Sequence, residues 1–171
     1  MLSWSNALHL LRECGLDESR IAHSVGVSKA AFELACAIKR KNPDAPCNPE
    51  KVRIGALLHD IGRSRPGDHE LNSVAVLRER GLDDLAGIVM HGTLYEASIL
   101  RNQPNREYLP ASLENKIVAW ADTRFRLSPV TIEERIAEVE KRRAGEEEKI
   151  AALRMARERY MALERELMGL R

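Results

Sequence analysis

Residues 54–62 read IGALLHDIG, an apolar run that ends in a histidine and an aspartate. The preceding Asn48-Pro49-Glu50 has the order of a helix start: a capping residue, a proline and an acidic first turn. We therefore expect a buried helix that ends at His59-Asp60. Burying an imidazole and a carboxylate costs several kcal/mol unless they are paired or coordinated, so the sequence predicts something that neutralises them.

The same arrangement, an apolar run followed by a potential ligand, occurs twice more. Ile88-Val89-Met90 leads to His91, and Ile117-Val118-Ala119-Trp120-Ala121 leads to Asp122. His23 lies in the opening turns of a further predicted helix, which Asp17 can cap. Nitrogen and oxygen donors of this kind suit a hard or borderline divalent metal ion. The alternative is a set of buried polar side chains that satisfy one another.

Composition favours an all-α fold. The 171 residues are 44% hydrophobic and 31% charged but only 4% aromatic, which is typical of helices. Thr131 and Glu134 form a capping box, from which we expect one long, charged, amphipathic helix to the C-terminus. We expect a helical core domain over residues 1–128 and a helical extension over residues 129–171. Within the core, helices are expected near residues 3–14, 17–42, 49–59, 69–80, 82–91 and 112–122, with an irregular region over 92–110.

Charge and cysteine content exclude several classes of protein. A net charge of +1 gives no overall field that would attract nucleic acid or an anionic membrane, so extensive nucleic-acid binding is not expected. Cys14, Cys36 and Cys47 are odd in number and lack CxxC spacing, which indicates free thiols in a reducing compartment. The N-terminal residues do not resemble a signal peptide, and no run approaches the roughly 18 apolar residues of a membrane span. We expect a cytoplasmic protein without a membrane partner.

The order His23, His59-Asp60, Asp122 resembles the H…HD…D signature of the HD superfamily of metal-dependent phosphohydrolases. Residues 59–62, His-Asp-Ile-Gly, match its HDIG variant, and the likeness to small archaeal and bacterial HDIG proteins covers about residues 17–125. The resemblance implies an HD-type helical bundle with one or two divalent ions, of Mn, Fe, Co, Ni, Zn or Mg. One ion would take His23, His59, Asp60 and Asp122, and the second would take His69 and His91 with Asp60 bridging.

By this resemblance the chain is an enzyme that hydrolyses a phosphoester or phosphoanhydride with a metal-bound hydroxide. Its partner would be a small phosphorylated substrate: a nucleotide, a dinucleoside polyphosphate or a phosphomonoester. Asp60 would belong to the catalytic centre, and Arg63 and Arg124 are candidates to stabilise charge on the phosphoryl oxygens. Asp68, beside His69, is either a general acid or a helix cap.

Two other functions remain open on the sequence. The chain could be a nucleotide-binding regulatory HD module that keeps the metal pocket without turnover. It could also be an assembly protein that forms a homodimer, or docks a partner, through its C-terminal helix. The apolar steps from Leu153 to Leu170 in that helix suit either subunit packing or a core within one chain.

Overall fold

The computed structural model describes residues 2–171, and it confirms the all-α class. Over this range the backbone forms helices and no strand, apart from one isolated bridge between Phe125 and Pro129. The elements in chain order are α1 (Trp4–Glu13), α2 (Glu18–Lys41), α3 (Pro49–Leu58), η1 (Ile61–Ser64), α4 (His69–Glu79), α5 (Asp83–Ala86), α6 (Leu94–Leu100), η2 (Arg106–Tyr108), α7 (Leu113–Arg124), α8 (Ile132–Arg142) and α9 (Glu147–Leu170).

Capping side chains fix where several of these helices begin. The Asp17 carboxylate accepts a hydrogen bond from the backbone N–H of Arg20 at 2.9 Å and starts α2. Asn48 caps α3 in the same way, with Pro49 as the first helical residue. Thr131 and Glu134 form the predicted capping box of α8. Because each side chain satisfies an N–H that has no partner within its helix, these starts could be predicted from the sequence.

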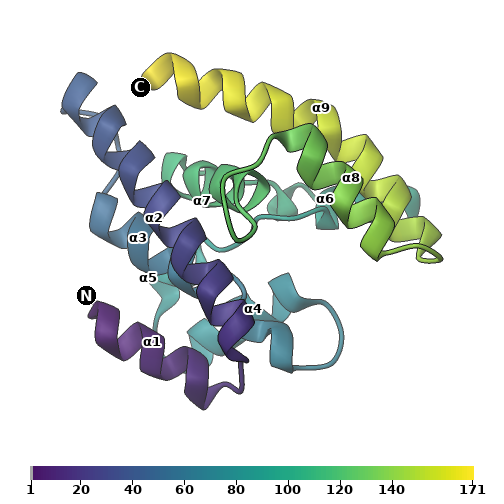
Figure 1. Ribbon diagram of the computed structural model, residues 1–171, viewed down its shortest axis with the longest axis horizontal. Coiled ribbons are helices and arrows are strands. Elements are labelled where there is room, and N and C mark those ends of the chain that lie inside the picture. Colours follow the sequence, from purple (N-terminus) through teal and green to yellow (C-terminus); the bar gives the residue numbers. More distant parts are fainter. Residues whose placement is uncertain (1) are drawn as a thin grey trace.

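Helix α2 contributes one long buried face to the core. It packs against both α3 and α7 (Figure 1). Its buried residues include Ile21, Val27, Leu34 and Ile38. By length and composition alone, α2 would also be apolar enough to cross a membrane, with a mean hydropathy of 1.3 over its most apolar stretch. A helix at the centre of a globular core meets the same criteria, and the packing on α3 and α7 is of that kind.

Two predictions for residues 82–110 are wrong. The helix expected over 82–91 ends at Ala86, and the segment from Ile88 to His91 runs as a loop. The 92–110 region, which was expected to be irregular, contains α6 and the short η2. Ile88 and Val89 are fully or almost fully buried although they are not helical, so their apolar character indicated burial and not a helix.

The expected single C-terminal helix is divided in two. The chain turns at Gly145, whose φ of 93° lies in the left-handed region that glycine adopts without steric cost. Helices α8 and α9 pack against each other as an antiparallel hairpin that lies over α6 and α7 (Figure 1). The turn was not predicted because the segment begins with a capping box and consists mostly of helix-favouring residues.

The apolar seam of α9 is buried within its own chain. Leu163 and Leu167 join the main hydrophobic core, where α9 meets α7. Leu153, Ala156 and Tyr160 form a smaller cluster with Ile132 of α8. The extension after residue 128 is therefore packed against the helical core along much of its length.

Candidate metal centre

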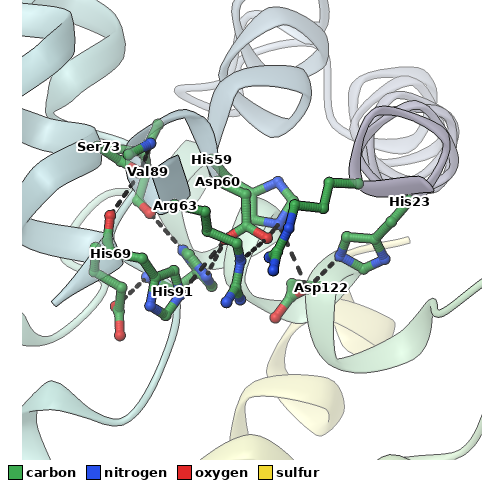
Figure 2. A network of polar contacts seen from close by, with 12 residues as sticks. His23, His59, Asp60, Arg63, His69, Ser73, Val89, His91 and Asp122 are labelled. Carbon is green, nitrogen blue, oxygen red and sulfur yellow. Dashed lines mark hydrogen bonds and ion pairs between the residues drawn. The ribbon is translucent and has the colours of Figure 1, made fainter. Parts of the chain in front are cut away.

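Six predicted ligands converge on one region, although they come from distant parts of the sequence. Figure 2 shows the His59–Asp60 pair in the middle, His23 and Asp122 on one side, and His69 and His91 on the other. The donors lie on α2 (His23), at the end of α3 (His59, Asp60), at the start of α4 (His69), in the loop between α5 and α6 (His91) and on α7 (Asp122).

The first group consists of His23, His59 and Asp122. The Asp122 Oδ1 atom lies 3.0 Å from Nε2 of His23 and 3.5 Å from Nε2 of His59. Each of the three residues offers one donor atom, and these atoms lie within 4.8 Å of one another. Three donors at this spacing could hold a metal ion between α2, α3 and α7.

The second group surrounds Asp60. The Asp60 Oδ1 atom lies 3.5 Å from Nε2 of His69 and 3.6 Å from Nε2 of His91. The other carboxylate oxygen, Oδ2, lies 3.7 Å from Nε2 of His59. His59, Asp60 and His91 also have donor atoms close enough to share an ion. Asp60 and His59 thus stand between two neighbouring sets of donors.

Backbone carbonyl groups orient three of the four imidazoles. The Nδ1 atoms of His23, His59 and His91 lie 3.0, 2.7 and 2.7 Å from the carbonyl oxygens of Arg126, Ala56 and Val89. Because a carbonyl only accepts hydrogen bonds, each Nδ1 must carry the hydrogen. In the neutral ring the lone pair then sits on Nε2, which is the atom that faces the carboxylates.

Within residues 2–171, two buried atoms at the centre of the cluster have no hydrogen-bond partner: Nε2 of His59 and Oδ1 of Asp60. The His59 side chain is completely buried and the Asp60 side chain is 4% exposed. Leaving such atoms unsatisfied is costly, and native proteins seldom do so without a ligand, an ion or a water molecule. The donor set therefore fits a divalent metal ion.

The carboxylates are charged in this environment. Burial raises the pKa of Asp60, but the nearby His59 and Arg63 outweigh burial and hold it below its ordinary value. Burial likewise opposes the charge on Asp122, whereas the hydrogen bond with His23 and the proximity of His59 and Arg135 hold its pKa well below the usual range. An ionised carboxylate is the protonation state that binds metal.

The pKa values of the histidines shift in different directions. Burial lowers the pKa of His69 to about 3, and the charge on Asp60 only partly opposes this. For His23, burial is outweighed by the hydrogen bond and charge of Asp122, and its pKa is raised. His69 is consequently a neutral imidazole at physiological pH.

Glu70 and Asn115, which the sequence analysis missed, hold the loop that carries His91. Glu70 Oε2 accepts hydrogen bonds from the backbone N–H groups of His91 at 3.0 Å and Gly92 at 2.7 Å. The Asn115 amide donates to the carbonyl oxygens of Ile88 and Met90 at 3.0 and 2.5 Å. Both side chains are buried. Their only sequence signal was a polar residue on an apolar helix face.

Gly62 explains why the residue after His-Asp-Ile is small. A Cβ atom at this position would lie 2.3 Å from the backbone nitrogen of Ser73, so only glycine allows η1 to approach α4 this closely. The Gly62 N–H donates to the Ser73 hydroxyl at 3.0 Å. This contact fixes the turn that carries Asp60 against the helix that carries His69.

The two predicted arginines lie in different surroundings. Arg63 donates through Nε to Asp60 Oδ2 and lines the pocket beside the cluster. Arg124 instead pairs with Glu164 of α9 at 3.3 Å, and it lines neither pocket at the site. Its place beside a carboxylate is taken by Arg135 of α8, whose Nη2 lies 3.7 Å from Asp122 Oδ1. Arg135 was not among the predicted residues, because the face of the extension that meets the site depends on tertiary packing.

Asp68 caps α4. Its carboxylate accepts hydrogen bonds from the backbone N–H groups of Glu70 and Leu71 at 2.9 and 3.3 Å. Of the two roles considered for this residue, the helix cap accounts for its contacts, and a general acid is not identified among the residues that line the site.

Comparison with known families decides what kind of domain surrounds this cluster. The HD domain model matches residues 20–127, which contain all six donors. The chain belongs to the HD-domain family. The HD domain is the module of a superfamily of metal-dependent phosphohydrolases, so the resemblance seen in the sequence is confirmed. The match ends before α8, so the α8–α9 hairpin lies outside it.

Relatives of this HD protein differ in architecture. It is 38% identical over 149 residues to an uncharacterised protein of Methanocaldococcus jannaschii. This match covers 82% of this chain and 86% of the relative. It is also 34% identical to tRNA (cytidine(56)-2'-O)-methyltransferases of Picrophilus torridus and Thermoplasma volcanium, over 67% and 69% of this chain. Those two matches cover only 34% and 35% of the methyltransferases. No solved structure is significantly similar to the chain.

Proposed function

We propose that this HD protein is an enzyme that hydrolyses a phosphoester or phosphoanhydride of a small substrate with the help of bound divalent metal. The observation that carries this proposal is the pair of buried atoms without partners, His59 Nε2 and Asp60 Oδ1, among four further donors. A purely structural polar cluster would be expected to satisfy its central atoms internally.

The six donors are enough for two ions. His23, His59, Asp60 and Asp122 would hold the first, and His69 and His91 would hold a second with Asp60 shared. A bound divalent ion supplies Lewis acidity and lowers the pKa of water toward neutrality, which provides a nucleophile at physiological pH. Between them, imidazole and carboxylate donors suit ions such as Mn, Fe, Co, Ni, Zn and Mg.

The protein's own residues prepare the site for an anionic substrate. The carbonyl groups of Arg126, Ala56 and Val89 hold three imidazoles with Nε2 turned toward the carboxylates of the centre. Arg63 and Arg135 each place a guanidinium beside a carboxylate of the centre. Guanidinium groups bind phosphoryl oxygens through charge-assisted hydrogen bonds, so these two would bind and orient the phosphoryl group under attack.

We also propose that the protein resides in the cytoplasm, and the structure limits how it could form a homodimer. The cysteines Cys14, Cys36 and Cys47 are all free, which suits a reducing cytoplasm. The apolar seam of α9 is used within the chain, so a homodimer through the C-terminal helix would have to form through other residues of that helix, such as the exposed Met155.

The decisive experiment combines metal analysis with activity. Elemental analysis of the protein as purified should find first-row metal. A screen of nucleotides, p-nitrophenyl phosphate and bis(p-nitrophenyl) phosphate with each candidate metal should find hydrolysis. Asp60→Asn should abolish both metal retention and turnover, whereas the control His9→Gln should change neither, because His9 is exposed and pairs with Glu13. Wild-type protein that binds none of these metals would contradict the proposal.

The regulatory alternative makes a different prediction in the same assay. A nucleotide-binding HD module without turnover would retain metal and bind a nucleotide tightly, but release no product. Metal-replete protein that behaves in this way would replace the hydrolase proposal with that one.

A further inference from the structure

Helix α8 lies over the mouth of the metal centre although it is outside the matched HD domain. Arg135 in its first turns reaches within 3.7 Å of Asp122, and its side chain is only 13% exposed. Arg142 follows seven residues later, so both side chains project from the same face of the helix. The extension thus contributes charged groups to a site that the core domain builds.

Glu138, between them on the same face, positions both arginines. Its carboxylate accepts a hydrogen bond from Arg135 Nη1 at 2.9 Å and lies 3.7 Å from Arg142 Nε. The Arg142 side chain is still 53% exposed, so most of its guanidinium donors are free to bind a ligand. Arg135 is the buried member of the pair, and Arg142 is the accessible one.

The arginines form a wall shared by two adjoining pockets. Arg63, Arg135 and Arg142 line both pockets, of which one opens on His69 and His91 and the other on His23 and Asp60. The first pocket adds two more cations of the hairpin, Arg143 and Lys149, and the second adds Arg20 and Arg126.

Positive charge is concentrated here far beyond the average of the molecule. Seven basic side chains line the two pockets against four acidic ones, in a chain with a net charge of only +1. Two of those acids, Asp60 and Asp122, are candidate metal ligands whose charge a cation would offset. The remaining basic side chains extend from the metal centre along α8 to Arg142 and Arg143, where Glu138 and Glu146 offset part of their charge.

From this arrangement we infer that Arg142, with Arg143 and Lys149 beside it, binds a second phosphate of a substrate that contains two or more linked phosphates. Arg63 and Arg135 stand next to the metal ligands and serve the phosphate under attack, whereas Arg142 binds the next one along the chain. This inference rests on the proposed function for its choice of substrate, and it makes the α8–α9 hairpin a specificity element. A phosphomonoester would not use it.

Calorimetry on the protein as purified tests the inference through binding alone. Methylenediphosphonate, whose P–C–P bridge cannot be hydrolysed, should bind more tightly than methylphosphonate. Arg142→Gln should weaken methylenediphosphonate binding about 10-fold, the loss of one charge-assisted hydrogen bond, and leave methylphosphonate unchanged. The matched control Arg154→Gln removes the same charge from the outer side of the hairpin, where Arg154 pairs with Glu140 and is 68% exposed. It should bind like wild type.

Three results would overturn the inference. The first is that wild type and Arg142→Gln bind methylenediphosphonate with equal affinity. The second is that wild type does not prefer methylenediphosphonate over methylphosphonate. The third is that a short single-stranded oligoribonucleotide binds this site as tightly as methylenediphosphonate does. The last result would point to nucleic acid as the ligand, in line with the name of the two methyltransferase relatives.

Kinetics separates this inference from the proposed function. With metal bound, Arg142→Gln should raise KM for a nucleoside triphosphate about 10-fold with kcat retained, and should leave bis(p-nitrophenyl) phosphate unaffected. A rise in KM for both substrates would contradict a role confined to the second phosphate. If wild type hydrolyses neither substrate, the proposed function fails, and the calorimetry still decides whether Arg142 binds linked phosphates.

Discussion

Glu70 of α4 and His91 lie 21 positions apart in the sequence, and the Glu70 carboxylate accepts the backbone N–H of His91 at 3.0 Å. The same oxygen accepts the N–H of Gly92 at 2.7 Å. The loop that carries His91 is therefore anchored by a buried carboxylate, and it is adjacent to His69 because Glu70 follows His69 on α4. This anchor replaces the helix that the sequence analysis expected to position His91.

Substitution of Glu70 should show how much this anchor contributes. Glu70→Ala leaves two buried N–H groups without an acceptor, which should lower the free energy of unfolding by about 2–4 kcal/mol. Glu70→Gln keeps one oxygen that both N–H groups can share, so its loss should be about 1 kcal/mol or less. Urea unfolding measures both. Equal losses in the two variants would show that the acceptor oxygen is not what holds the loop.

Gly62 should be intolerant of the smallest possible side chain. In Gly62→Ala the new Cβ would overlap the backbone of Ser73, so η1 must move away from α4 at a cost of about 1–3 kcal/mol. Gly169→Ala is the control, because nothing lies within 4 Å of its Cβ position near the end of α9. That change should be neutral or stabilise by up to about 1 kcal/mol. Thermal unfolding measures the stability of both variants. Similar changes in Tm for Gly62→Ala and Gly169→Ala would refute close packing at Gly62.

Metal should stabilise the folded protein measurably. A ligand that binds only the folded state contributes about 2.7 kcal/mol at 100 times its Kd, which corresponds to about 5–10 °C in Tm for a chain of this size. Protein stripped with a chelator should gain this shift when Mn or Zn is restored. His59→Ala should lose it, since His59 belongs to both candidate groups. An identical Tm with and without metal would argue against a resident ion.

His69 should make the metal-stripped protein less stable in acid. Its pKa is about 3 in the folded protein against an ordinary 6.5, so between these values the unfolded chain takes up a proton that the folded chain does not. Stability should thus fall as pH decreases from 6.5, with a slope of at most about 1.4 kcal/mol per pH unit from this group. His23 and His91 have raised pKa values, so their contributions are complete below pH 6.5 and are lost only above it.

Urea unfolding of the metal-stripped protein at pH 6.5 and at stepwise lower pH checks this. His69→Gln should flatten the dependence until the carboxylates begin to titrate below their ordinary pKa of 3.8. An unchanged slope in His69→Gln would mean that His69 takes up a proton in the folded protein as readily as in the unfolded one.

Four of the six donors, His59, Asp60, His91 and Asp122, could be predicted from local features, because each follows a strongly apolar segment where an unpaired polar group would be costly. His69 was predicted only from the resemblance to the HD superfamily. The position of His91 on a helix was wrong because Ile88 and Val89 are buried as a loop whose carbonyl groups Asn115 satisfies. Burial and helicity leave the same apolar signal in a short segment.

Arg135 could not be predicted for a different reason. Which face of the extension meets the site depends on the turn at Gly145 and on packing between residues far apart in the sequence, such as Leu167 with the core. Arg124 looked better placed because it follows Asp122 directly, yet its side chain turns to Glu164 on the other side of α7. The candidate ligands could be found from the sequence, whereas tertiary packing determines which arginines lie beside them.

The C-terminal hairpin should prove to be part of the folding unit, and Leu167 is the residue that tests this most directly. Its side chain is completely buried in the main core, so Leu167→Ala should lower the free energy of unfolding by about 2–5 kcal/mol. Leu127→Ala removes the same atoms from a side chain that is 72% exposed, and should change stability by less than about 0.5 kcal/mol. Denaturant unfolding in a single transition for both variants would show that α9 and the HD domain fold together. If Leu167→Ala instead left the main transition unchanged, α9 would be a separable appendage, and the arginines of α8 would have no rigid support from which to bind a substrate.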